Sequence, residues 1–221
     1  MGFFALGIEK IKIHKIYEFI GKGEVRFHSF VSDRQLTLPG AQALLNATSA
    51  SDRKDVVMEL ATDVISRWES ITIDNVKEGH SFEFGDTGRI LYRSDSIPQS
   101  LDWFMLAIED DQKVRDLGSR LEEFFSDDRV DKVTGAINTL VTGTSAVSPG
   151  AAAGIVLGKT LLSGMTFLMK RKKDDLLAII EQSFIRQLHY PTGTRYKKEV
   201  QDLTANAWYD YFIYGSDESI E

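Results

Sequence analysis

The chain has 221 residues, of which 43% are hydrophobic and 27% are charged, and its formal net charge is -7 at pH 7. This composition is that of a soluble globular protein with a sizeable core, and the negative charge argues against broad nucleic-acid binding. The absence of cysteine excludes disulfides, thiolate zinc sites and cysteine nucleophiles. The N-terminal stretch lacks the basic region and the cleavage site of a secretory signal, so we expect a cytoplasmic protein.

The first third of the chain predicts β-strands. Two apolar-rich runs, residues 8–20 and 24–31, flank Gly21-Lys22-Gly23, which indicates a β-hairpin between them. Further strands are predicted at residues 71–76, 81–84, 90–92 and 101–108, and again at Val200 and residues 205–214. In the last strand we expect one side to carry Tyr209, Tyr211 and Ile213, and the other to carry Trp208, Phe212 and Tyr214. The 101–108 segment is almost entirely apolar, which is typical of a strand buried on both faces.

A helix is predicted after residue 49. Ser49 and Ser51 with Asp52 offer oxygens that can cap the free amides of a first turn. The apolar residues that follow, from Val56 to Trp68, recur at helical spacing and form one stripe.

The segment after the apolar strand is acidic. Glu109, Asp110 and Asp111 follow the strand directly, and Asp116 comes next. Converging carboxylates at a strand end are ligands that Ca²⁺ prefers. The segment resembles the third calcium loop of the calcium-and-lipid-binding β-sandwich domains of synaptotagmin and protein kinase C. The resemblance implies calcium ligands at Glu109, Asp111 and Asp116; alternatively, Asp110 and Asp111 charge the first turn of a following helix.

Residues 112–188 show no strand pattern and predict a long helical section. Ser148 and Pro149 are a typical helix start. Small residues recur four apart on both sides of this start, and such spacing lets two helix backbones approach closely. We therefore predict a glycine-faced helical hairpin, with packing at Gly135, Gly143, Gly150, Gly154 and Gly158.

This hairpin region is apolar enough to raise the question of a membrane span. Residues 133–169 carry a single charge, Lys159. In the window 150–169, seven strongly apolar residues each contribute roughly -0.3 to -0.6 kcal/mol to insertion, whereas Lys159 near the centre costs about 2.5 to 3.5 kcal/mol. The sum disfavours a permanent span, so we expect a close-packed soluble hairpin. Conditional insertion into a membrane remains an alternative.

Signatures of catalysis are weak. Residues 153–160 (AGIVLGKT) match a relaxed phosphate-loop spelling, but Ile, Val and Leu fill the loop interior and no strand precedes it. The histidines have no zinc-binding spacing, and the chain contains no GxSxG motif. An enzyme is therefore not indicated.

Two basic clusters interrupt the acidic average. We name them as candidate contacts for an anionic membrane or another anion: Lys170, Arg171, Lys172 and Lys173, and Arg195, Lys197 and Lys198. Basic residues near an anionic bilayer contribute about 1 kcal/mol each.

Together these patterns predict an α+β protein of one domain, residues 1–221, in which an antiparallel β-sandwich carries a helical insertion at 112–188. The favoured function is a non-catalytic membrane-associating or binding module, whose partner is an anionic membrane surface or a protein, with calcium as a candidate cofactor. One alternative is a structural or assembly protein that forms a homo-oligomer through its aromatic C-terminal strand. The other is a nucleotide-dependent enzyme.

Overall fold

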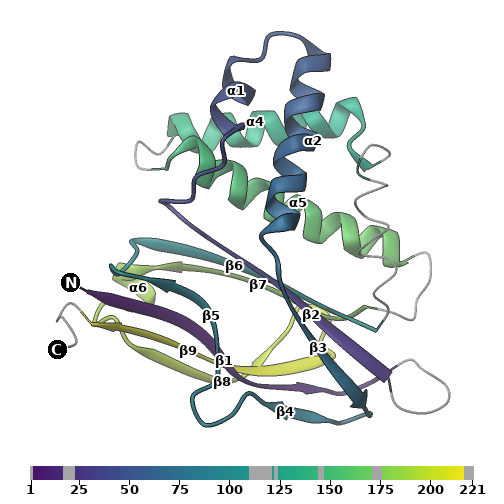
Figure 1. The fold of residues 1–221 in the computed structure, drawn as a ribbon, viewed down its shortest axis with the longest axis vertical. Coiled ribbons are helices and arrows are strands. Elements are labelled where there is room, and N and C mark those ends of the chain that lie inside the picture. The colour runs from purple at the N-terminus through teal and green to yellow at the C-terminus, as the bar shows by residue number, and fades with distance from the viewer. Residues whose placement is uncertain are drawn as a thin grey trace. The chain divides into compact units, whose positions relative to one another are not determined.

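The computed structural model (Figure 1) describes residues 2–16, 23–109, 121, 124–143, 147–170 and 176–216, apart from the side chains of residues 165–170. The chain divides into two compact units. The sheet unit comprises Met1–Val31, Glu69–Asp110 and Lys172–Glu221, and the helical unit comprises Ser32–Trp68 and Asp111–Arg171. The helical unit thus draws on two chain segments, whereas the sequence predicts a single insertion over residues 112–188.

The first sheet of the sheet unit has five strands: β1 (Phe3–Ile13), β4 (Ser81–Glu83), β5 (Arg89–Ser94), β8 (Arg195–Gln201) and β9 (Ala207–Ser216). β1 pairs antiparallel with β9 along almost its whole length, and with β4 and β5 on its other edge. β8 pairs antiparallel with β9 and ends the order β4-β1-β9-β8.

The second sheet has the order β3-β2-β6-β7. Its strands are β3 (Glu69–Val76), β2 (Gly23–Asp33), β6 (Ser100–Ile108) and β7 (Leu176–Ile185), and the short helix α6 (Arg186–His189) follows β7. As predicted, β6 is buried on both faces from Trp103 to Ile108.

The predicted β1–β2 hairpin is wrong. β1 lies in the first sheet and β2 in the second, so the two strands do not pair. Both edges of β1 are occupied, by β9 on one side and by β4 and β5 on the other, while β2 lies between β3 and β6. The turn that we predicted at residues 21–23 falls largely outside the described residues.

The predicted helix at the end of residues 112–188 is also wrong, because β7 occupies Leu176–Ile185. β7 pairs antiparallel with β6 over its whole length; Leu106, for example, lies opposite Ile179. A strand buried on both faces, as β6 is, must have its backbone amides and carbonyls paired. β7 supplies that pairing from a position about seventy residues further along the chain.

The two sheets share one apolar core. The Trp103 ring of β6 lies edge-on to Tyr209 and Tyr211 of β9, with ring centroids 5.6 Å and 6.0 Å apart. Trp103 also donates a hydrogen bond from Nε1 to Ser29 Oγ, at 3.0 Å. The predicted alternation of β9 is confirmed on this inner face, where Tyr209, Tyr211 and Ile213 are all buried.

Because this core contains buried tyrosines, the stability of the protein changes with pH in the alkaline range. Burial raises the pKa of the Tyr209 hydroxyl well above its ordinary value of 10, although Gln182 Nε2 donates to its oxygen at 3.0 Å. The folded protein therefore holds this proton more tightly than the unfolded chain does. The stabilisation is complete below pH 10 and is lost as pH rises above it.

We therefore expect the free energy of unfolding, measured in urea from pH 8 to about 11, to fall steeply above pH 10. In Tyr209→Phe the fall should be shallower, because one titrating group has been removed. Burial raises the pKa of Tyr211 as well, so part of the slope should remain. An unchanged slope in Tyr209→Phe would contradict this assignment.

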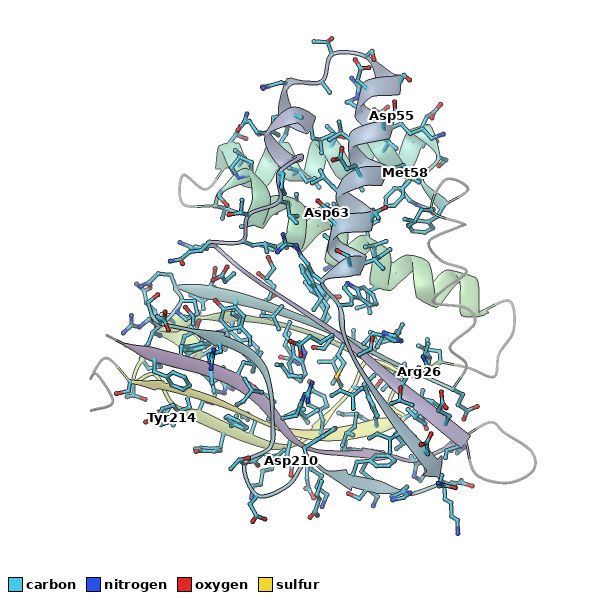
Figure 2. All side chains as sticks on the ribbon, in the orientation of Figure 1. Arg26, Asp55, Met58, Asp63, Asp210 and Tyr214 are labelled. Carbon is cyan, nitrogen blue, oxygen red and sulfur yellow. The ribbon has the colours of Figure 1, made fainter. Side chains whose placement is uncertain are left out.

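The described helices of the helical unit are α1 (Ala41–Asn46), α2 (Ala50–Ser66), α4 (Asp127–Gly143) and α5 (Pro149–Lys170). The predicted start of α2 is confirmed: Ser49 Oγ accepts a hydrogen bond from the Asp52 amide at 3.0 Å. The start of α5 is confirmed too, since Ser148 Oγ accepts from the Ala151 amide at 3.2 Å. Asp55, Met58 and Asp63 lie along α2 (Figure 2).

The structure does not confirm a glycine-faced hairpin. Gly135 and Gly143 of α4 lie on exposed positions, and a methyl group added at either would meet no described atom within 4 Å. Gly150 and Gly154 of α5 do make close contacts, but with the segment 32–38 of the same unit instead of α4. Gly158 is buried in α5.

Candidate functional site

The predicted calcium ligands are only partly within the described residues. Glu109 follows β6 directly and is buried, whereas Asp111 and Asp116 lie outside the described residues. Across the described ranges, no group of three or more histidine or carboxylate side chains is placed to hold a metal ion. Calcium binding at Glu109, Asp111 and Asp116 stays a prediction.

The two predicted basic clusters differ in what the structure describes. Lys170 is the last residue of α5, and Arg171, Lys172 and Lys173 lie outside the described residues. Arg195, Lys197 and Lys198 belong to β8, which ends the first sheet. Arg195 donates from Nη1 to the His189 carbonyl at 3.1 Å, while Lys197 and Lys198 are exposed. Lysines on an edge strand also discourage pairing with another chain.

The segment that resembles a phosphate loop lies inside α5. Residues 153–160 are helical throughout, so their amides serve the helix and do not form an anion-binding loop. Within the described residues, no helix has the length and apolar character needed to cross a membrane.

A groove between α4 and α5 is a candidate site in the helical unit. It has a volume of about 700 Å³, within the range typical of ligand pockets. The two helices pack against each other along it. Apolar side chains supply much of its walls: Phe124, which precedes α4, then Val133, Ala136 and Leu140 of α4, and Ile155 and Val156 of α5.

Basic side chains line the same groove. Arg129 and Lys132 come from α4, and Lys159 comes from α5. No described residue that lines the groove is acidic. The groove therefore combines apolar walls with a positive charge.

Arg129 is held in place at one end of the groove. Its guanidinium lies 4.0 Å from the centre of the Phe124 ring, and Nη1 donates to the Phe124 carbonyl. The Phe124 ring lies against Gly164 of α5, where an added methyl carbon would come within 2.3 Å of the ring. Gly164 thus provides the space for Phe124, and Phe124 orients Arg129 by a cation–π contact.

Two of the three acidic side chains of α4, those of Asp127 and Asp131, are directed toward α2. Asp131 Oδ1 lies 3.3 Å from Arg53 Nη2, and Asp127 Oδ1 lies 3.8 Å from Lys54 Nζ, both on α2. These ion pairs are partly exposed and contribute little to stability. Asp127 and Asp131 therefore direct their negative charge toward α2, whereas the side chains of α4 that line the groove include Arg129 and Lys132.

The groove is not among the predicted sites, although the sequence carries a signal for it. Arg129, Lys132, Ala136 and Thr139 recur at steps of three and four residues, which places them on one helix face. In the sequence, Lys159 is the single charge of a long apolar stretch and part of the phosphate-loop spelling, and neither pattern points to α4. That the two faces meet depends on how α4 and α5 pack.

No protein-family model matches the chain, and no curated protein matches it in sequence. The function is therefore inferred from the chemistry of the groove.

Proposed function

We propose that the protein is a non-catalytic module that associates with anionic membranes, and that the α4–α5 groove holds one acyl chain of an anionic phospholipid. The observation that carries this proposal is the combination of apolar walls with Arg129, Lys132 and Lys159 in one groove. In this view the two sheets of the other unit form a β-sandwich scaffold.

The walls favour an acyl chain. Val133, Ala136 and Leu140 of α4 face Ile155 and Val156 of α5 across the groove. Such a surface gains roughly 0.8 kcal/mol for each CH₂ group that it removes from water. The small side chain of Ala136 leaves room for a guest in the groove.

The basic residues favour an anionic headgroup. A phosphate accepts charge-assisted hydrogen bonds from guanidinium and ammonium groups, and these bonds are stronger than neutral ones. The three cations of the groove and its lack of described lining carboxylates suit a headgroup with net negative charge better than a zwitterionic or neutral one. Asp127 and Asp131 of α4 pair with basic residues of α2 and do not line the groove.

Liposome flotation tests this proposal. The protein should float with vesicles of phosphatidylcholine mixed with phosphatidylglycerol, and much less with pure phosphatidylcholine. The double variant Lys132→Gln with Lys159→Gln removes two charges worth about 1 kcal/mol each near a bilayer, so its affinity should fall about 30-fold.

Two further variants distinguish lipid binding in the groove from general electrostatic attraction between the protein and an anionic membrane. Lys197→Gln with Lys198→Gln removes the same charge from β8 and should leave flotation nearly unchanged. Ala136→Trp fills the groove without changing charge and should weaken flotation. If Ala136→Trp floats like the wild type, or if the β8 variant loses as much as the groove variant, the proposal is wrong. Parallel samples with calcium and with EDTA test the predicted calcium ligands.

A further inference from the structure

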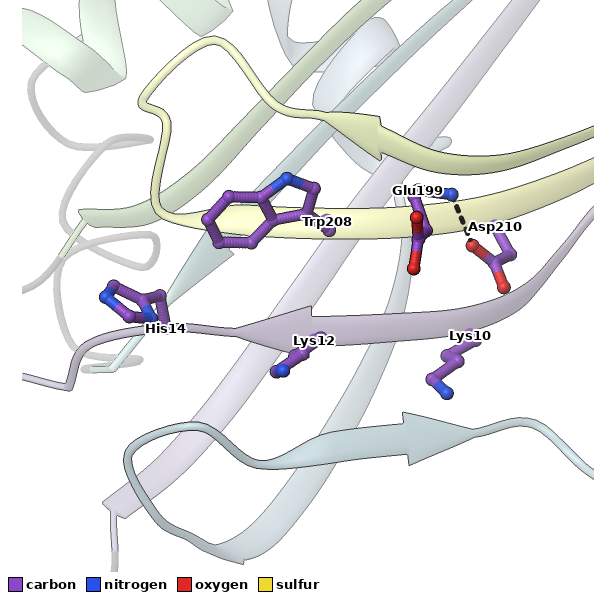
Figure 3. Close-up of a pocket in the computed structure, with 6 residues that line it drawn as sticks. All are labelled: Lys10, Lys12, His14, Glu199, Trp208 and Asp210. Carbon is purple, nitrogen blue, oxygen red and sulfur yellow. Dashed lines mark hydrogen bonds between the residues drawn. The ribbon is translucent and has the colours of Figure 1, made fainter.

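A second, unrelated depression lies on the first sheet (Figure 3). It has a volume of about 460 Å³ and is lined by Lys10, Lys12, His14, Glu199, Trp208 and Asp210. All six residues belong to the sheet unit. The groove of the helical unit shares none of them.

Strand alternation gathers these side chains on one face. Lys10 and Lys12 of β1 point away from the core, because Ile11 and Ile13 between and beyond them are buried. On β9 the same alternation places Trp208 and Asp210 outward. The register then sets Lys12 opposite Trp208 and Lys10 opposite Asp210.

A β-bulge brings Glu199 into the group. The β8–β9 register shifts between Lys197 and Val200, and Glu199 has the unusual backbone angle φ = 53°. Its amide donates to Asp210 Oδ1 at 2.7 Å, the bond drawn in Figure 3. Bulges of this kind re-aim a side chain and are frequent beside functional sites. A positive φ in a residue other than glycine costs free energy and is often retained for function.

Neither sign of charge prevails in the depression. Lys10 and Lys12 are balanced by the carboxylates of Glu199 and Asp210, and Lys10 also lies 3.5 Å from Glu83 of β4. A polyanion or a cation would meet repulsion as well as attraction here. A neutral ligand with many hydroxyl groups can use both kinds of partner, since a hydroxyl both donates and accepts.

Trp208 supplies an apolar surface among these charges. Its side chain is half-buried, and the His14 ring meets it edge-on, with centroids 5.9 Å apart and planes at 85°. A large aromatic ring with a few charged groups around it combines apolar contact with directed hydrogen bonds. The C–H face of a sugar ring is apolar and its rim is polar, so a sugar matches this arrangement.

We propose that this depression binds a neutral saccharide. One sugar ring lies against Trp208, its hydroxyls donate to Glu199 and Asp210, and they accept from Lys12. This inference is independent of the proposed membrane function, which depends on the other unit. An aromatic nucleoside would stack on Trp208 as well, but it has fewer hydroxyls for the four charged groups.

Calorimetric titration with neutral hexasaccharides tests the inference. The probes are cellohexaose, maltohexaose and laminarihexaose, with adenosine as the competing aromatic ligand. We expect at least one hexasaccharide to bind, and Trp208→Ala to weaken that binding about tenfold or more. The matched control is Tyr214→Ala, which lies on the same strand but outside the depression and should bind like the wild type. Figure 2 labels Tyr214 and, within the depression, Asp210.

Trp208→Ala could lose binding because it misfolds. Glu199→Gln is a second site variant that changes only an exposed side chain, so it is expected to fold normally. It should weaken saccharide binding about threefold, the loss of one charge-assisted hydrogen bond to a solvent-exposed group, while the circular dichroism spectrum stays unchanged. The inference fails if no hexasaccharide binds, if adenosine binds more tightly than every hexasaccharide, or if both site variants bind like the wild type.

Discussion

Replacing Asp202 by alanine should lower the free energy of unfolding by about 3–5 kcal/mol. Asp202 is buried, and its carboxylate accepts five hydrogen bonds. Oδ1 accepts from the amides of Asn206 and Ala207, at 2.9 Å and 2.8 Å. Oδ2 accepts from the amides of Ile179 and Thr204, at 2.9 Å and 2.8 Å, and from Thr204 Oγ1 at 2.6 Å.

The cost is large because this carboxylate joins the two sheets. Ile179 belongs to β7 of the second sheet, while Ala207 begins β9 of the first. Asn206 extends the connection, since its Nδ2 donates to the carbonyls of Lys15 and Leu177, both at 3.0 Å. Without Asp202, several buried amides lose their acceptor, and each unpaired buried donor costs about 1–3 kcal/mol.

Urea unfolding followed by tryptophan fluorescence measures this effect. Asp202→Asn keeps one acceptor oxygen and should fall between the wild type and Asp202→Ala. Asp210→Ala is the matched control, because Asp210 accepts one backbone bond at a partly exposed position; it should cost less than about 1 kcal/mol. Equal losses in Asp202→Ala and Asp210→Ala would refute the role assigned to Asp202.

Gly150→Ala should destabilise the helical unit by about 2 kcal/mol or more, although alanine favours a helix by about 1 kcal/mol over glycine. The added methyl carbon would lie 2.5 Å from the Leu36 carbonyl oxygen and 2.8 Å from the Leu38 amide nitrogen. Both are backbone atoms, so neither can turn aside. The N-terminal end of α5 or the segment 36–38 would have to move.

Gly135→Ala, in the same unit, should instead stabilise the protein. A methyl group at Gly135 meets no described atom within 4 Å, so only helix propensity changes. This variant should be more stable than the wild type by about 0.5–1 kcal/mol. Urea unfolding followed by circular dichroism at the helical band compares the two variants. A Gly150→Ala protein as stable as Gly135→Ala would show that the contact with segment 36–38 does not matter.

Local chemistry was sufficient to predict several elements. The starts of α2 and α5 were predicted from Ser49 and Ser148. Each serine accepts a hydrogen bond from the backbone amide three residues later, so the cap involves only neighbouring residues. The two-residue alternation around Tyr209 and Tyr211 predicted the inner face of β9 for the same reason. These signals need no knowledge of the rest of the fold.

Pairing between distant segments could not be predicted in this way. β7 was expected to be helical, because a short apolar run such as residues 176–180 fits a buried helix as well as a strand. The hairpin of β1 and β2 was expected because the two strands are consecutive. In both cases the structure is decided by which strand supplies the hydrogen-bond partners. β7 pairs with β6, which is distant in sequence, and β1 and β2 each pair with other strands of their own sheet.

The candidate sites likewise combine local features, which can be predicted from the sequence, with long-range groupings, which cannot. The sequence alone determined that the chain is an α+β protein without cysteine chemistry, and it specified the helix starts and the faces of single strands, since each depends on residues within a few positions. Two groupings follow from the three-dimensional packing alone: Arg129, Lys132 and Lys159 share a groove, and Glu199 joins Lys12 and Trp208. Those groupings depend on helix packing and on strand register, and each is set by burial and hydrogen bonding summed over the whole unit.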